Sequence, residues 1–168
     1  MIDPVLLSTA STVRMAMCAV VAPHAWRDTT LEGACGIASY ALVRALKLRG
    51  RAATFVLGWH ECECGGADCG AGIGHCWTEV GGAIIDITAL QFHASAPDVY
   101  VPRSETQLAC YRAEMRGTHA IHSARGWYRF QQSWMLRIFE PRAIDSLVMA
   151  AIGLTERTEL AGLARRTA

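Results

Sequence analysis

The 168-residue sequence predicts an α+β domain in which a group of strands lies between helical segments. Three observations favour this class: apolar residues at helical spacing near the start, β-rich segments in the middle, and helical patterns again after Pro102. With 52% hydrophobic and 18% charged residues, the chain is long enough to bury one sizeable core. We therefore expect a single domain over residues 1–168.

Charge and the apolar start limit the partners and the location. The formal net charge of +1 lacks the basic excess that phosphate binding normally shows, so we expect neither nucleic acid nor a membrane as partner. Asp3 precedes the apolar start and Arg14 interrupts it, which argues against a signal peptide or a membrane span. We expect a cytoplasmic site of synthesis, and specialised export as an effector stays open.

Two helices are expected before the strands. Apolar residues recur at roughly helical spacing over residues 5–21 and Pro23 follows, so the first helix should end near Ala22. Residues 35–50, CGIASYALVRALKLRG, carry an apolar stripe, basic residues in the last two turns and Gly50 as a stop. Cys35 therefore lies in the first turn of the second helix.

The middle of the chain predicts strands, and the end predicts helices. Residues 52–59, AATFVLGW, have the β-branched and aromatic content of a strand, whereas residues 60–74 are rich in glycine and cysteine and predict a loop. Residues 74–92, GHCWTEVGGAIIDITALQF, predict two strands joined by a two-glycine turn. After Pro102 the helical patterns cover residues 105–117, 127–139 and 141–153.

The expected hairpin places chemistry on one of its faces. With Gly81 and Gly82 at the centre of the turn, the facing pairs are Val80–Ala83, Trp77–Asp86 and His75–Thr88. His75 and Asp86 are then diagonal neighbours on one face, about 7–8 Å apart at the backbone, a gap that their side chains can close. An aspartate on one ring nitrogen fixes the histidine tautomer and leaves the other nitrogen for a nucleophile.

Cys35 is the candidate nucleophile. The exposed N–H groups and the positive end of the helix dipole favour a thiolate at a helix start, and a His75 imidazolium would favour it further. Small neighbours, Gly33, Ala34 and Gly36, would let a substrate backbone approach. Taken singly, Cys35 could be a buried core thiol and His75 a structural histidine; their joint order favours a Cys-His-Asp triad.

This order of residues resembles the papain-like and transglutaminase-like cysteine-enzyme superfamily. The blocks GACGIASYALVRALKLRG and GHCWTEVGGAIIDITALQF look most like bacterial lasso-peptide leader peptidases and papain-fold toxin or deamidase domains. The resemblance implies a catalytic helix packed on a small antiparallel sheet, a catalytic core of about residues 30–92 and a helical tail of about residues 103–168. It implies a thiol protease, deamidase or transglutaminase-like enzyme that acts on a peptide or protein through Cys35, His75 and Asp86 and requires no cofactor.

One family feature is absent. Papain-type peptidases carry a glutamine shortly before the cysteine as an oxyanion donor, and no glutamine occurs between Trp26 and Cys35. The backbone N–H of Cys35 could supply one donor to the oxyanion. Trp77, Gln91 or another group would supply the second.

The cysteine-rich segment supports a rival function. It contains four possible zinc ligands, which are His60, Cys62, Cys64 and Cys69. Their spacing is not that of a standard zinc finger, so a flexible or disulfide-pinned flap and an inert loop stay open as alternatives. A structural zinc would favour a different class of protein, a zinc-stabilised or catalytically inactive peptide-binding module of the same fold.

Overall fold

The computed structural model describes residues 3–21, 31, 33–61, 73–92, 95–131, 142–150 and 153. Its centre is an antiparallel sheet with the strand order β3-β2-β1-β4. The strands are β1 Ala53–His60, β2 Ile73–Val80, β3 Ala83–Ile85 and β4 Tyr111–Arg116. The helices are α1 Pro4–Val21, α2 Cys35–Leu48, η2 Ala89–Gln91, α3 Glu105–Ala109 and α4 Thr118–Gln131, and residues 142–150 are also helical. These helices and this antiparallel sheet confirm the predicted α+β class.

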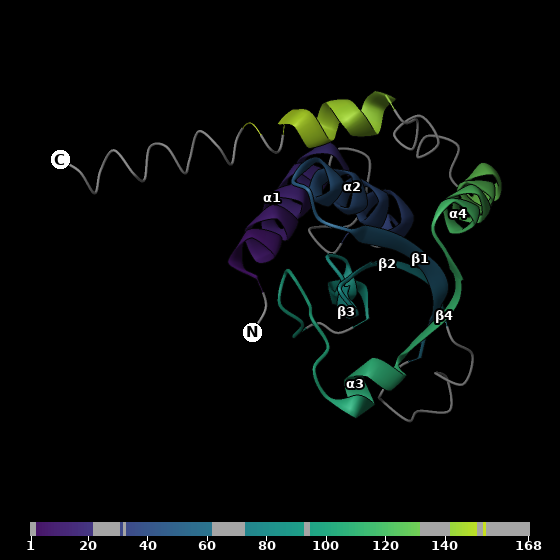
Figure 1. Cartoon of the computed structure of the whole chain (residues 1–168). Helices are drawn as coiled ribbons and strands as arrows, with labels where there is room; N and C mark the ends of the chain where they lie inside the picture. The colour runs from purple at the N-terminus through teal and green to yellow at the C-terminus, as the bar shows by residue number, and fades with distance from the viewer. Residues whose placement is uncertain are drawn as a thin grey trace.

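Helix α2 packs against one face of the sheet, and α1 lies beside α2 (Figure 1). Both helices end within a residue or two of the predicted positions, and α2 is followed by Gly50 at a φ of 71°. The apolar face of α2 is fully buried against α1 and the strands, and it contributes Ile37, Leu42 and Leu46 to the core. Because Cys35 is the first residue of α2, the packing of this helix also places the Cys35 side chain in the main hydrophobic core.

The hairpin between β2 and β3 has the predicted register. Val80 pairs with Ala83 across the turn, and Gly81 and Gly82 have the positive φ angles of 55° and 83° that the turn needs. The ladder ends at Ile85, so the expected pairs Trp77–Asp86 and His75–Thr88 are not part of it. Asp86 instead exchanges two backbone hydrogen bonds with Tyr100, at 2.9 and 2.8 Å.

The prediction of one helix over residues 105–117 is wrong in its second half. A capping box of Ser104 and Gln107 starts α3, but α3 ends at Ala109 and β4 follows. Residues 111–116, YRAEMR, alternate apolar and charged side chains, which is the period of a half-buried strand. They pair with the second edge of β1, whose backbone N–H and C=O groups would otherwise lack partners. The predicted helical tail therefore contains the fourth strand of the sheet.

The helical predictions after β4 fare better. Helix α4 begins at Thr118, nine residues before the expected start at Trp127, and packs on β1, β4 and α2. Residues 132–139 of that expected helix lie outside the described residues. The expected helix over residues 141–153 is confirmed over residues 142–150, where Ile144 and Val148 join the core. No helix among the described segments is both long enough and apolar enough to cross a membrane.

Candidate active site

Strand β2 presents different side chains to the two faces of the sheet. Cys76 and Thr78 point toward α2, where the Thr78 hydroxyl donates to the Ser39 carbonyl at 3.2 Å. His75 and Trp77 point to the opposite face, because successive residues of a strand alternate in direction. The site therefore forms where the start of α2 meets the start of β2.

His75 and Asp86 form a fully buried pair. His75 Nε2 and Asp86 Oδ2 are 2.7 Å apart, and both side chains have a relative exposure of 0%. The prediction that these two side chains share one face within hydrogen-bond reach is confirmed. Strand β2 holds the imidazole and the residue directly after β3 holds the carboxylate, so the short two-glycine turn between the strands brings them together.

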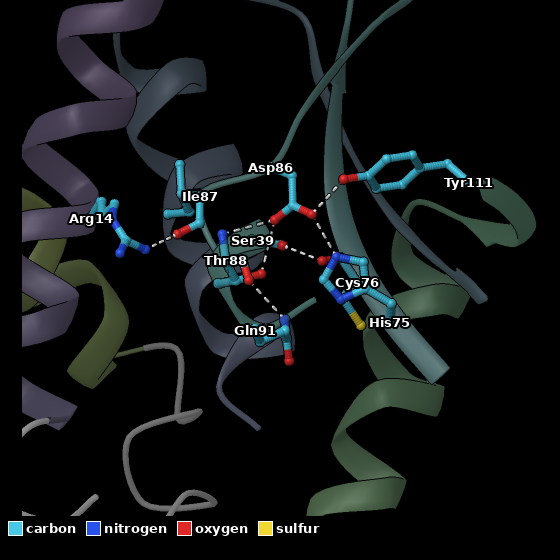
Figure 2. A network of polar contacts seen from close by, with 9 residues as sticks. All are labelled: Arg14, Ser39, His75, Cys76, Asp86, Ile87, Thr88, Gln91 and Tyr111. Carbon is cyan, nitrogen blue, oxygen red and sulfur yellow. Dashed lines mark hydrogen bonds and ion pairs between the residues drawn. The ribbon is translucent and has the colours of Figure 1, made fainter. Parts of the chain in front are cut away.

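The Asp86 carboxylate is saturated with donors, as Figure 2 shows. The backbone N–H and the hydroxyl of Thr88 donate to Oδ1 at 2.8 and 2.9 Å. The Tyr111 hydroxyl donates to Oδ2 at 2.8 Å, beside His75. These charge-assisted bonds hold the carboxylate in one orientation and keep it ionised although it is buried.

The charges of the pair shift both pKa values. Burial alone would lower the pKa of His75, but the charge of Asp86, its hydrogen bond and the nearby Cys35 raise that pKa to about 10. Burial would raise the pKa of Asp86, but the charge of His75 and the hydrogen bonds from His75, Thr88 and Tyr111 lower it below 3.8. The stable form at neutral pH is an imidazolium next to a carboxylate.

Tyr111 was missed by the sequence analysis. It lies at the start of β4, opposite His60 of β1, on the face that carries His75. Burial and the negative charge of Asp86 raise the pKa of Tyr111, so its hydroxyl stays protonated and donates to Asp86 at neutral pH. The alternation in residues 111–116 could have revealed the strand, but not the contact with Asp86.

Aromatic rings enclose the imidazole of His75. Trp77 stacks beside it with centroids 5.9 Å apart, and Phe92 and His60 meet it edge-on at 4.7 and 5.9 Å. His60 in turn stacks on Phe92 at 4.2 Å and meets Tyr111 at 4.8 Å. Because these rings are apolar, they strengthen the electrostatic interactions of the imidazole that they surround.

Both side chains suggested as oxyanion donors lie near this cluster. The indole Nε1–H of Trp77 is buried and makes no hydrogen bond to any part of the chain that the structure describes. The Gln91 side chain donates from Nε2 to the Thr88 carbonyl at 3.0 Å, within the loop that carries Asp86. Trp77 thus has an unused donor on a ring that lies beside His75, whereas one donor of Gln91 is used to hold the loop.

Cys35 is the first residue of α2 and is only 8% exposed. A hydrogen bond from the Cys76 thiol lowers the pKa of Cys35 well below 9.0 against the opposing effect of burial, and His75 lowers it further by hydrogen bonding and charge. The Nδ1 atom of His75 makes no hydrogen bond of ordinary geometry within the described segments. The Cys35–His75 interaction is therefore not a well-aligned hydrogen bond, as is common for catalytic pairs before substrate binds.

A buried arginine anchors the loop after Asp86. Arg14 of α1 donates from one terminal nitrogen to the Ile87 carbonyl (Figure 2). It also donates from Nε to Asp98 at 3.0 Å. Arg14 is 3% exposed and its charge is compensated by these partners. Sequence reasoning used Arg14 only as an interruption of an apolar run and missed this role.

The structure describes only one of the four proposed zinc ligands, His60. His60 is the last residue of β1, not part of a loop, and is buried among Phe92 and Tyr111. Cys62, Cys64 and Cys69 lie outside the described residues. Within the described segments, no group of three or more His, Cys, Asp or Glu side chains could hold a metal ion.

A scan against protein-family models found no match to this chain, and searches of curated proteins and of solved structures found none either.

Proposed function

We propose that the protein is a cysteine-dependent amide hydrolase or acyl-transfer enzyme of papain-like fold that acts on a peptide or protein. The observation that carries this proposal is the buried 2.7 Å contact between His75 and Asp86 beside Cys35 at the start of α2. A core histidine needs no carboxylate held by four hydrogen bonds, and a core cysteine needs no lowered pKa. Together these groups suit a Cys-His-Asp triad.

The proposed reaction begins with the thiolate of Cys35. Its sulfur attacks the amide carbonyl carbon, and the imidazolium of His75 gives its proton to the leaving amine. Water or an amine then attacks the acyl-enzyme, and His75 takes the proton of the attacking group. The acyl group leaves Cys35 and the thiolate is restored.

Asp86 and the aromatic wall serve this proton transfer. Asp86 accepts the hydrogen bond of Nε2–H, so Nδ1 is the ring nitrogen that faces the reaction. The backbone N–H of Cys35 is our candidate for one oxyanion donor, and the unused Nε1–H of Trp77 is our candidate for the second. The peptidase, deamidase and transglutaminase reactions share these steps and differ in the leaving group and the acceptor.

Thiol labelling tests the nucleophile. We expect brief treatment with iodoacetamide near neutral pH to modify Cys35 before any other cysteine, because the pKa of its thiol is lowered, whereas the pKa values of Cys18 and Cys76 are raised. Peptide mapping measures the order of modification. Labelling of Cys62 or Cys64 first, with Cys35 unmodified, would contradict the assignment.

Amide turnover tests the function itself. On a panel of peptides and proteins, Cys35→Ala should abolish turnover while the melting temperature stays the same or rises slightly, because functional sites often cost stability. Cys18→Ala is the matched control, since Cys18 lies on α1 and burial raises the pKa of its thiol. Full turnover by Cys35→Ala removes this site from the reaction. A folded wild type that turns over no amide, together with metal in the purified protein, supports the zinc-stabilised binding module instead.

A further inference from the structure

A second cysteine meets the proposed nucleophile. Cys76 follows His75 in β2 and points toward α2, and both Cys35 and Cys76 are reduced in the structure. The Ser39 hydroxyl donates to the Cys76 carbonyl at 2.9 Å (Figure 2). Since Ser39 lies one turn after Cys35 on the same side of α2, this bond holds Cys76 against the helix face that carries Cys35.

The two thiols touch and have opposite acid–base character. Cys35 receives a hydrogen bond from the Cys76 thiol and another from the Cys76 backbone. The hydrogen bond to Cys35, together with burial, raises the pKa of Cys76 well above 9.0, whereas the pKa of Cys35 is lowered. A thiol with a lowered pKa therefore lies beside a thiol with a raised pKa, which suits an attacking and a resolving cysteine.

We propose that Cys35 and Cys76 form a reversible disulfide when the protein meets a hydroperoxide, and that this bond switches the active site off and protects Cys35 from irreversible oxidation. The geometry that carries the proposal is the buried placement of Cys76 against the face of α2 that carries Cys35, fixed by the hydrogen bonds of Ser39 with the Cys76 carbonyl and of Thr78 with the Ser39 carbonyl. Its regulatory meaning rests on the proposed function, whereas formation of the disulfide does not.

The reaction balances in two steps. The Cys35 thiolate attacks one peroxide oxygen, so an S–O bond forms, the O–O bond breaks, and the alcohol or water leaves after taking a proton. The Cys76 sulfur then attacks the sulfur of the Cys35 sulfenic acid, an S–S bond forms, and hydroxide leaves and takes the Cys76 proton as water. Two thiols are oxidised and one hydroperoxide is reduced.

Four proteins test the inference: wild type, Cys76→Ser, Cys76→Ala and the control Cys18→Ser. Serine at position 76 keeps a hydroxyl donor next to Cys35 but cannot form a disulfide, whereas alanine removes both properties. Each protein is treated with hydrogen peroxide, blocked with iodoacetamide and digested without reduction. Fragment spectra then identify the partner of Cys35 and its oxidation state, before and after dithiothreitol.

Wild type and Cys18→Ser should yield a peptide that joins Cys35 to Cys76, and dithiothreitol should restore labelling of Cys35. Cys76→Ser should yield Cys35 sulfinic acid that dithiothreitol does not reverse. The inference is overturned if wild type forms no such link, if Cys35 joins Cys62, Cys64 or Cys69, or if Cys76→Ser recovers as well as wild type. The wild-type link needs no variant, so a variant that fails to fold leaves the test decisive.

The mass measurements separate this inference from the proposed function. If wild type forms the Cys35–Cys76 link but cleaves no amide, the disulfide inference holds and the proposed function is wrong. A protein that turns over amides without forming the link overturns the disulfide alone. Where both hold, oxidised wild type should lose turnover and regain it with dithiothreitol, in step with the link.

Discussion

The face of the sheet that carries the helices is mostly aliphatic, whereas the opposite face is mostly aromatic and polar. On the helix side, Phe55 and Leu57 of β1 pack with Leu42 and Leu46 of α2 in the main core. The other side contains a smaller cluster around Trp77 and the hydrogen-bonded group of charged and aromatic side chains. Because β2 alternates between the faces, one strand serves stability with every second residue and the proposed chemistry with the others.

The contrast between the two faces predicts whether a substitution should change stability or turnover. Burial of apolar surface supplies most of the folding free energy, so the helix side should carry stability. A buried ion pair contributes little net stability against hydrophobic groups of the same size, so the aromatic face should carry catalysis. Cys35 lies at the boundary, since it belongs to the main core and interacts with His75.

The largest expected effect comes from the orienting carboxylate. Asp86→Asn keeps the side-chain volume but removes the charge that supports imidazolium, and we expect amide turnover to fall by up to about 10⁴-fold. The matched change on the other face is Leu46→Ala, which should lower the free energy of unfolding by about 2–5 kcal/mol and leave turnover per folded molecule unchanged. Kinetics beside thermal melts measure both. The division between the faces fails if Leu46→Ala lowers turnover as much as Asp86→Asn does.

The features of the fold and site that the sequence predicted correctly depend on contacts between residues that are close together in the chain. The hairpin register, and with it the contact of His75 with Asp86, depends on two glycines and a period of two, which are local signals. The position of Cys35 followed from a strong helix pattern. The catalytic roles of these residues stay a prediction, because geometry alone does not measure turnover.

The missed features depend on long-range contacts. Strand β4 pairs with β1 across more than fifty positions of sequence, and the capped helix α3 directly before it made a continued helix the natural local prediction. The hydrogen bond from Tyr111 to Asp86 exists only after that pairing. The contact of Cys76 with Cys35 was hidden because Cys76 points away from His75, and only the packing of α2 on β2 brings the two thiols together.

A smaller effect on turnover is expected from Tyr111, which lies on the aromatic and polar face of the sheet. Tyr111→Phe removes one donor from Asp86, and a hydrogen bond to a charged group is worth about 1.5–3 kcal/mol, so turnover should fall by about 10-fold to 100-fold. Tyr40→Phe, on α2, removes a phenolic hydroxyl from the helix side and should leave turnover unchanged. Kinetic constants of both variants make the measurement.

The acid sensitivity of Tyr111→Phe distinguishes positioning from simple packing. The Tyr111 hydrogen bond helps to lower the pKa of Asp86, so the pKa should rise when the hydroxyl is removed. The stability that Asp86 contributes is lost as the pH falls through its folded-state pKa, and the variant should therefore unfold at a higher pH during acid titration. An unchanged acid midpoint together with unchanged turnover would show that Tyr111 only fills space.

The smallest effect, and the most direct measure of the ion pair, is the pH dependence of stability. The folded-state pKa of His75 is about 10, above its usual value of 6.5, so its contribution is fully present below pH 6.5 and is lost as the pH rises through 10. The lowered pKa of Asp86 makes its contribution present above pH 3.8 and lost at lower pH. The pair should therefore stabilise the fold most between pH 3.8 and 6.5.

Asp86→Asn removes the pair, so its melting temperature should differ from that of wild type most within this window, and the difference should shrink steadily toward about pH 10. Both proteins are best compared in a Cys35→Ala background, because the Cys35 thiol has a shifted pKa of its own. Thermal melts across the pH range make the measurement. A constant difference would mean that His75 and Asp86 meet as neutral groups, and the aromatic face would then differ from the helix side in packing alone, without the charge that the proposed mechanism requires.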